Sequence, residues 1–262
     1  MTFMGEYTCD LFDCPSFKMV TFGDCHRANN ILIDKRFEPE SMRIWCQLAK
    51  TATCILDIGA HVGVYSLAAA SLRKDIKIHA FEPNPYAYTR LREHKLLNGF
   101  TNLKDYPVAL ADRSDFVAFG WLRRPGHYIS SGGTMLQELP ANPASEESII
   151  ARTRRLGDFK ISYGDRPLVK IDVEGGERVV LKGARALLQA QPDIIIESFS
   201  QNNCDAITEL LRPGYKVFRI IEDGRLEPID RLTAADGQGQ DFNQFVTWRE
   251  TSRETVGDST CT

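Results

Sequence analysis

The sequence lacks long apolar runs and a strong charge of either sign. No apolar run reaches the roughly 20 residues that span a bilayer, and the first residues show no basic segment followed by an apolar stretch. We therefore expect no membrane span and no signal or transit peptide, and we expect a cytoplasmic protein. The net charge is −3, from 32 basic and 35 acidic residues, which gives no electrostatic footprint for nucleic acids or anionic membranes.

Closely paired cysteines are also missing. The seven cysteines form no CxxC pair and their number is odd, so we expect reduced thiols. The five histidines show no ligand-like spacing to these cysteines, which argues against a zinc site. A length of 262 residues suits one large domain with embellishments, and it is ample for a buried core.

A glycine turn follows an apolar strand at residues 53–58. Asp57 ends the apolar run, and Gly59 and Gly63 come two and six residues later. Such glycines let the backbone pass close to a ligand and let the next helix start tightly. The third glycine of the dinucleotide fingerprint is absent, because Ser66 stands at its position. The spacing therefore favours S-adenosylmethionine over a nicotinamide cofactor.

A second strand, at residues 76–82, also ends in an acid. Glu82 is followed by Pro83, about twenty residues beyond the glycine turn. An acid at this position in a Rossmann-like sheet reaches the ribose hydroxyls, so Asp57 and Glu82 are predicted to bracket one nucleoside. We interpret Asn84 as the residue that begins the next helix.

Two carboxylates mark the end of a third strand at residues 168–173. Asp172 and Glu174 share a face if the strand is extended, and Gly175 and Glu177 follow them. Neighbouring carboxylates raise one apparent pKa, which suits a group that accepts a proton near neutrality, and they also suit a sulfonium cation. We interpret Glu177 as a partner of the positive end of the next helix.

Glu197 ends the next strand, at residues 193–197, and would lie beside Asp172 and Glu174 in a parallel sheet. Three carboxylates at one edge raise the alternative of a divalent metal site, since hard cations favour oxygen ligands. Our primary expectation is a site without a metal.

Strands and helices alternate along most of the chain, which predicts an α/β fold with a mostly parallel sheet and helices on both faces. A glycine-rich loop precedes the last strand, so we expect the last pair to be antiparallel. The expected strands are 53–58, 76–82, 103–110, 168–173, 193–197, 215–221 and 242–248, and the expected helices are 62–72, 85–97, 176–190 and 205–211.

Three segments lie outside this alternation. Residues 1–50 contain strand-like pieces at 17–22 and 30–33 and a helix-like piece at 39–50, which we interpret as a lid or platform before the domain at 51–250. Residues 112–160 are interpreted as an inserted loop over the active site, although 116–121 has a strand pattern. Residues 251–262 lack apolar periodicity and are expected to be a flexible tail.

The order and spacing of these motifs resemble FkbM-type methyltransferases. The resemblance rests on residues 57–63, 81–83, 170–184 and 195–197, covers roughly residues 30 to 200, and is most specific at 170–184. It implies a class I methyltransferase fold that is Rossmann-like, with seven strands in the order 3-2-1-4-5-7-6. It also implies methylation of a hydroxyl on a sugar, polyketide or other small metabolite, with S-adenosylmethionine as donor.

The resemblance also implies roles for residues. It places five residues of the glycine turn around the methionine part of the cofactor: Asp57, Gly59, Ala60, His61 and Gly63. It places Glu82, with Pro83 beside it, at the ribose, and Val108 and Ala109 at the adenine. Asp172 and Glu174 would face the acceptor. Residues 37–40 resemble a family pattern near the cofactor pocket, and residues 156–158 read Leu-Gly-Asp where many members have a Leu-Asp-Asp-like run.

The expected mechanism is in-line displacement, with the acceptor oxygen opposite the sulfur and its proton passing to Asp172 or Glu174. Two other functions remain open from the residues alone. The sheet and its acids also suit a nicotinamide-dependent oxidoreductase, and a cofactor-binding module without catalysis would carry the same motifs. The sequence does not identify the acceptor or the oligomeric state.

Overall fold

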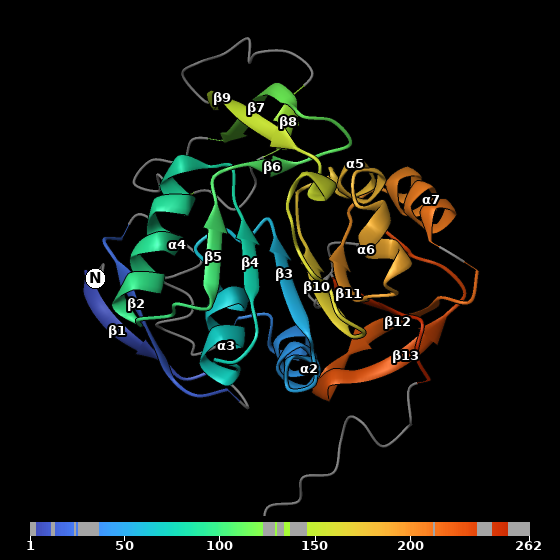
Figure 1. The fold of residues 1–262 in the computed structure, drawn as a ribbon, viewed down its shortest axis with the longest axis horizontal. Helices are drawn as coiled ribbons and strands as arrows, with labels where there is room; N and C mark the ends of the chain where they lie inside the picture. Colours follow the sequence, from blue (N-terminus) through green and yellow to red (C-terminus); the bar gives the residue numbers. More distant parts are fainter. Residues whose placement is uncertain are drawn as a thin grey trace, which may run out of the picture.

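The computed structural model centres on one eight-stranded sheet, with strands in the order β13-β12-β14-β11-β10-β3-β4-β5 (Figure 1). The structure describes residues 4–11, 14–23, 25, 37–122, 129, 134–136, 146–211, 213–234 and 243–250. The sheet strands are β3 (Cys54–Ile58), β4 (Ile78–Phe81), β5 (Leu103–Tyr106), β10 (Pro167–Ile171), β11 (Asp193–Glu197), β12 (Lys216–Ile221), β13 (Arg225–Ile229) and β14 (Asn243–Thr247).

The strand order confirms the predicted class I methyltransferase topology. Five strands, β3, β4, β5, β10 and β11, pair in parallel, and β14 runs antiparallel to both β11 and β12. Beyond the seven expected strands, β13 adds an eighth at the edge beside β12, after the short 3-10 turn η2 (Glu222–Gly224). The sequence of β13 includes Pro228 after the charged residue Glu227, and such a composition is typical of turns and edge strands.

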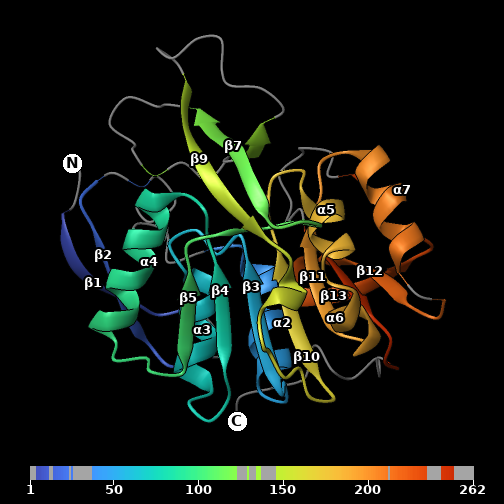
Figure 2. The same ribbon diagram turned by 45° about the horizontal axis from the view of Figure 1, so that its top comes forward.

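Helices cover both faces of the sheet (Figure 2), as predicted. One core cluster contains residues of α2 (Pro39–Ala49), α3 (Val64–Leu72) and α4 (Pro85–Leu97), and the other contains residues of α5 (Glu177–Lys182), α6 (Arg185–Gln189) and α7 (Gln201–Leu210). Successive strand residues alternate between the two cores, as Ile55 and Leu56 do. Among the described residues, no helix has the length and apolar character needed to cross a membrane.

The helix expected at 176–190 is two helices, because the chain bends at Gly183. A Cβ on Gly183 would lie 2.0 Å from the backbone oxygen of Ala111, so the chain passes that segment in close contact. The helix expected at 205–211 begins earlier, at Gln201. The strand expected at 103–110 leaves the main sheet after Tyr106.

A hairpin of β1 (Gly5–Cys9) and β2 (Phe17–Thr21) packs against α4. The buried ring of His94 in α4 links the two, because its nitrogens lie 3.1 Å from the Val20 oxygen and 2.9 Å from the Val62 oxygen. The strand at 17–22 and the helix at 39–50 are thus confirmed. The strand expected at 30–33 and the tail at 251–262 lie outside the described residues.

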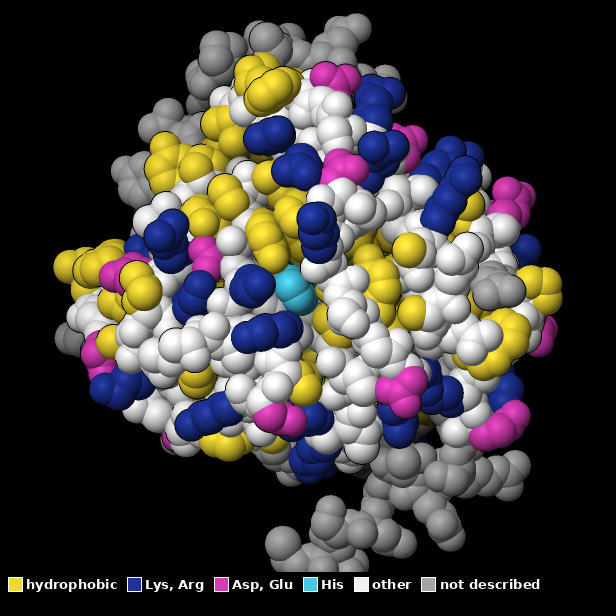
Figure 3. All heavy atoms as spheres, in the orientation of Figure 1, with side chains coloured by type: hydrophobic (Ala, Val, Ile, Leu, Met, Phe, Trp, Pro, Cys, Tyr) yellow, Lys and Arg dark blue, Asp and Glu magenta, His cyan; other side chains and the backbone are white. Residues whose placement is uncertain are grey.

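Within residues 112–160, predicted as an inserted loop with a strand pattern at 116–121, the described residues form strands over the carboxyl edge of the main sheet (Figure 1). A second sheet has the order β6-β9-β7-β8, with β6 (Ala109–Leu110), β7 (Asp115–Leu122), β8 (Thr134–Leu136) and β9 (Glu146–Arg154). One face of this sheet buries Phe119 and Trp121, whereas Phe116 and Ile150 are exposed on the other. Hydrophobic side chains at the top of Figure 3 lie over these strands.

Candidate active site

A cleft lies at the carboxyl ends of β3, β4, β10 and β11, where parallel sheets bind their ligands. The empty space in and around the cleft, including open solvent at its mouth, is about 1030 Å³. Of the residues predicted for the site, Gly63 does not line this cleft. Those that line it are Asp57, Gly59, Ala60, His61, Glu82, Pro83, Val108, Ala109, Asp172 and Glu174. The structure therefore brings together side chains that are up to 117 positions apart, the separation of Asp57 from Glu174.

The glycine turn after β3 fits tightly between β4 and β10. Gly59 has φ 84°, and a Cβ there would lie 1.8 Å from the backbone oxygen of Asp172. The amides of Gly59 and Ala60 both donate to the oxygen of Phe81 at 3.0 Å. Gly63 serves a different contact, because its Cβ would lie 2.2 Å from Cδ1 of Leu91 in α4. Glycine is thus favoured at 59 by the approach to the Asp172 backbone, and at 63 mainly by its left-handed backbone, with φ 92°.

Asp57 forms the floor of the cleft and anchors the next helix. Its side chain is buried, and Oδ2 accepts from the Ser66 amide at 3.0 Å and from Ser66 Oγ at 2.6 Å. Burial raises the pKa of Asp57 to about 6, against the lowering effect of these Ser66 bonds. Ser66, which stands in place of the third fingerprint glycine, therefore holds the acid in position.

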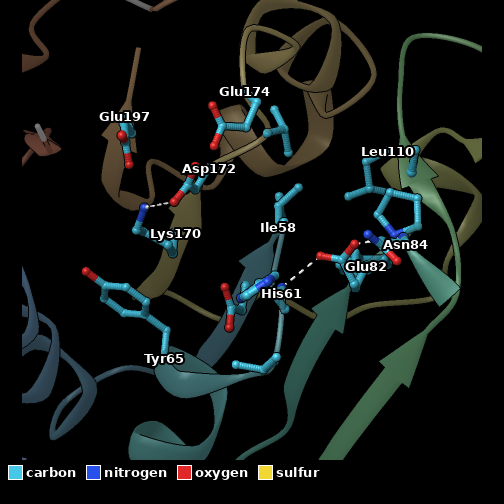
Figure 4. Close-up of a pocket in the computed structure, with 18 of the residues that line it drawn as sticks. Ile58, His61, Tyr65, Glu82, Asn84, Leu110, Lys170, Asp172, Glu174 and Glu197 are labelled. Atoms are coloured by element: carbon cyan, nitrogen blue, oxygen red, sulfur yellow. Dashed lines mark hydrogen bonds and ion pairs between the residues drawn. The ribbon is translucent and has the colours of Figure 1, made fainter. Parts of the chain in front are cut away.

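Glu82 closes the glycine turn from the other side. One carboxylate oxygen accepts from the His61 amide at 2.7 Å and the other accepts from the Asn84 amide at 2.8 Å (Figure 4). The bond to His61 supports a residue that has φ 50°, in the left-handed region. Asn84 begins α4 as predicted, because its Oδ1 accepts from the amides of Tyr86 and Ala87.

Burial raises the pKa of Glu82 from 4.5 to about 7, and this makes a prediction about stability. The folded state retains the proton between these values while the unfolded state releases it, so the free energy of unfolding falls as pH rises from about 4.5 to about 7. The fall attributable to Glu82 is on the order of 3 kcal/mol. Urea unfolding at pH 5 and pH 8 should therefore show a smaller fall in Glu82→Gln than in the original chain.

The matched control for this prediction is Asp75→Asn. Asp75 is exposed, and its hydrogen bonds with Arg73 lower its pKa to about 2, outside the tested window. This variant should show the same fall between pH 5 and pH 8 as the original chain. An unchanged fall in Glu82→Gln would show that Glu82 does not hold a proton in the folded state.

The wall of the cleft on the side of Glu82 is apolar. The wall comprises Val108, Ala109 and Leu110, with Phe119 of the second sheet and Phe81 of β4. The chain passes here from the main sheet into the second sheet, because β5 ends at Tyr106 and β6 begins at Ala109. Such a wall suits an aromatic base, and the adjacent Glu82 suits hydroxyl groups.

The opposite side of the cleft is charged. Lys170 is 1% exposed, and its Nζ lies 3.2 Å from Oδ2 of Asp172 and 5.2 Å from the centre of the Tyr65 ring. The β10–β11 register places Glu197 beside Asp172, because Ile171 pairs with Ile196. Figure 4 shows this group across the cleft from Glu82 and Asn84, with Ile58 and His61 between.

Glu38 completes this group from the start of α2. Its Oε2 accepts from the Tyr65 hydroxyl at 2.8 Å and from Nδ2 of Asn243 at 2.9 Å. Oxygen atoms of Glu38, Asp172 and Glu197 lie within 4.8 Å of one another, a spacing that a divalent cation can bridge. The Lys170 ammonium already supplies a positive charge within this group.

The charges in this group act on one another. Burial alone would lower the pKa of Lys170, but Asp172, Glu38 and Glu197 outweigh burial and raise it. Burial, followed by repulsion from Asp172, raises the pKa of Glu197 well above the usual range of a carboxyl group. These interactions therefore favour the charged form of Lys170 and the protonated form of Glu197.

The turn after β10 holds the remaining predicted acids. Glu174 lines the cleft with φ 53°, in the left-handed region. Glu177 is buried in the first turn of α5, where it accepts from the Gly175 amide at 2.9 Å and from Nδ2 of Asn203. Glu177 therefore stabilises the turn that carries Glu174, in addition to its place at the helix start.

Two residues of the cleft, Lys170 and Tyr65, were not among the sequence candidates. Lys170 stands in an otherwise apolar strand, and a lysine in a buried strand is a signal of a paired charge. Tyr65 follows the glycine turn inside an apolar helix, and its pattern is that of a core residue.

Comparison with known proteins identifies a family for this chain. Residues 57–217 match the methyltransferase FkbM domain. The hexuronic acid methyltransferase AglP of Haloferax volcanii is 26% identical over 186 residues, covering 68% of this chain and 69% of that protein. The 2-O-methyltransferase NoeI of Sinorhizobium fredii is 27% identical over 158 residues, covering 54% of this chain and 61% of that protein.

Solved structures with a similar arrangement include an S-adenosylmethionine-dependent O-methyltransferase from Thermotoga maritima. It has a TM-score of 0.46 and 11% identity over 90% of this chain and 76% of its own. A precorrin-6y C5,15-methyltransferase from Geobacter metallireducens has a TM-score of 0.43 and 15% identity, covering 80% of this chain and 88% of its own.

The cleft fits the cofactor of this family. The close approach at Gly59 keeps the turn free of side-chain bulk, the carboxylates suit a cationic sulfur, and the apolar wall suits a purine. The family match extends over more than half of the chain and includes Asp57, Glu82, Asp172 and Glu197. The chain belongs to the FkbM methyltransferase family and is an S-adenosylmethionine-dependent methyltransferase.

Proposed function

We propose that this methyltransferase acts on a hydroxyl group of a small metabolite, of the sugar or polyketide type. The observation that carries the proposal is the division of one cleft into two chemical halves (Figure 4). The half near Glu82 is apolar with one acid, whereas the half near Asp172 is rich in carboxylates. Carboxylates that accept hydrogen bonds and protons suit a hydroxyl acceptor.

In this proposal the residues predicted to bind the cofactor keep their predicted roles. Asp57, Gly59, Ala60 and His61 surround the methionine part of the cofactor, and Gly63 supports them by packing α3 on α4. Glu82 binds the ribose with Pro83 beside it, and Val108 and Ala109 contact the adenine. The bound cofactor supplies a methyl group on a positively charged sulfur.

Asp172 and Glu174 are proposed to act on the acceptor. A hydroxyl oxygen attacks more readily as it loses its proton, and either carboxylate can accept that proton. A positioned base contributes about 10²–10⁴-fold, whereas holding the reactants in line can lower the barrier by about 7–11 kcal/mol. Orientation of the acceptor by the carboxylate half therefore contributes more than proton removal.

The names of two relatives support this acceptor class. One is a hexuronic acid methyltransferase and the other a 2-O-methyltransferase, so both names point to sugar-type acceptors or to oxygen. The near-neutral charge of this chain supports a small acceptor rather than a nucleic acid, which requires a basic groove.

Methyl transfer to a panel of monosaccharides and uronic acids, followed with a radiolabelled donor, tests the proposal. The labelled product should survive mild alkali, because a methyl ether resists hydrolysis and a methyl ester does not. S-adenosylhomocysteine at about 100 times its dissociation constant should stabilise the fold by about 2.7 kcal/mol, while NAD should not. Alkali-labile product, or transfer to RNA alone, would contradict a hydroxyl acceptor, and stabilisation without any transfer would indicate a module that has lost catalysis.

A further inference from the structure

Lys170 lies in an unusual place for a lysine. It is in the central strand β10, its side chain is 1% exposed, and its neighbours Val169 and Ile171 pack into the core on the opposite face. Lysine is almost never buried unless it is paired, because removal of the ammonium from water costs several kcal/mol. A specific set of partners must therefore keep it there.

The partners of Lys170 come from four elements. Asp172, directly after β10, lies at 3.2 Å, and the Tyr65 ring on α3 lies at 5.2 Å. Glu197 on β11 and Glu38 at the start of α2 add two further carboxyl groups close enough to act on its charge. Asp172 is the partner with the short ion pair, and its side chain is 27% exposed toward the cleft.

This arrangement resembles a divalent metal site in which the cation is part of the chain. The oxygens of Glu38, Asp172 and Glu197 lie within 4.8 Å of one another. Carboxyl groups so close together stay ionised only beside a cation, and otherwise one of them takes up a proton. The ammonium meets that need, and because its stem is fixed in a buried strand it cannot leave as a bound ion can.

We propose that Lys170 is a positioning residue for methyl transfer, whose ammonium takes the place of a divalent cation and orients the Asp172 carboxylate toward the acceptor oxygen. The positioning role of Lys170 rests on the proposed function. The role of its ammonium as a cation does not depend on which acceptor is methylated. Two consequences follow. The original chain should not need or bind a divalent metal in this group, and removal of the ammonium should create a metal site.

Titration calorimetry with Mn²⁺ tests the cation role without any turnover. The original chain and the control Lys104→Met, altered at an exposed strand lysine, should show no binding at 1 mM, a concentration on the order of weak calcium sites. Lys170→Met should bind Mn²⁺ at least about tenfold more tightly than the original chain. Adding Asp172→Asn to Lys170→Met should abolish that gain.

Turnover tests the positioning role. Lys170→Met should lower kcat by about 10–100-fold, as removal of a group that orients another side chain does, with affinity for S-adenosylhomocysteine within about threefold. A merely structural role would lower stability and leave kcat of the folded fraction unchanged. If Lys170→Met does not fold, Lys170→Met with Glu197→Gln removes one acid and leaves Glu38 and Asp172 to hold Mn²⁺, so this double variant serves in both measurements.

The outcomes separate the two proposals. Mn²⁺ binding by the original chain as tight as in the folded variant, or no Mn²⁺ binding by the folded variant, would overturn the cation role of Lys170. An unchanged kcat in Lys170→Met would overturn its positioning role. Absence of transfer to every hydroxyl acceptor by the original chain would contradict the proposed function, and the Mn²⁺ comparison would still decide the role of Lys170.

Discussion

Asp172→Asn is expected to lower kcat by about 10²–10⁴-fold while S-adenosylhomocysteine binds within about threefold of the original affinity. Asparagine keeps the shape of the side chain but cannot take up the acceptor proton. The Asp172 carboxylate lies on the charged half of the cleft, across from Glu82, so its loss should affect the reaction more than cofactor binding. Single-turnover rates and calorimetry on the same preparation measure both quantities.

Glu174→Gln is the matched comparison, because the sequence leaves open which of the two acids is the base. Asp172 follows β10 directly and forms the ion pair with Lys170, whereas Glu174 lies in the left-handed turn two residues later. We therefore expect the larger loss in Asp172→Asn. A value of kcat within threefold of the original in Asp172→Asn would exclude that residue as the base, and a larger loss in Glu174→Gln would transfer the role to Glu174.

Gly59→Ala is expected to destabilise the fold by about 2–5 kcal/mol, from a forced overlap and a left-handed backbone. The added Cβ would lie 1.8 Å from the backbone oxygen of Asp172, and backbone at the end of a central strand cannot move aside cheaply. The melting temperature should fall on the order of 10 °C. Because the turn must shift away from β10, affinity for S-adenosylhomocysteine should fall with it.

Gly99→Ala provides the control for this prediction. Gly99 also has a positive φ, of 63°, but a Cβ there meets nothing within 4 Å. Its cost is therefore the backbone strain alone, about 1–2 kcal/mol, with no change in cofactor affinity. Equal losses of stability in the two variants would show that strain, rather than contact with Asp172, makes glycine necessary at position 59.

The central sheet could be predicted because each of its strands carries its own signal. The apolar runs of β3, β4, β10 and β11 end near acids, and parallel pairing then places those acids at one edge. The bend at Gly183 could not be predicted, since it depends on contact with Ala111, 72 residues earlier. The second sheet was missed for the same reason: β7 pairs with β9 across the intervening segment, and no local pattern specifies such a register.

The candidate site divides in the same way. Asp57, Glu82 and Asp172 follow apolar strands, so local pattern identifies them. The charged half depends on partners that are distant in the sequence. Glu38 bonds to Asn243 across 205 positions. The role of Lys170 can be recognised only when Glu197 and Glu38 are known to lie near it. Sequence pattern also does not show that Ser66 replaces a glycine in order to bind Asp57.

The eighth strand has a consequence for how molecules of this protein can meet. β13 is the outermost strand beside β12, and it presents Arg225, Glu227 and Pro228, which has no amide hydrogen. A neighbouring chain that continued the ladder there would meet these charged side chains and a proline, both of which are typical of edges that resist pairing. Pairing of β13 with a strand of another molecule is therefore disfavoured. This protects a parallel, slow-folding sheet from edge-to-edge aggregation.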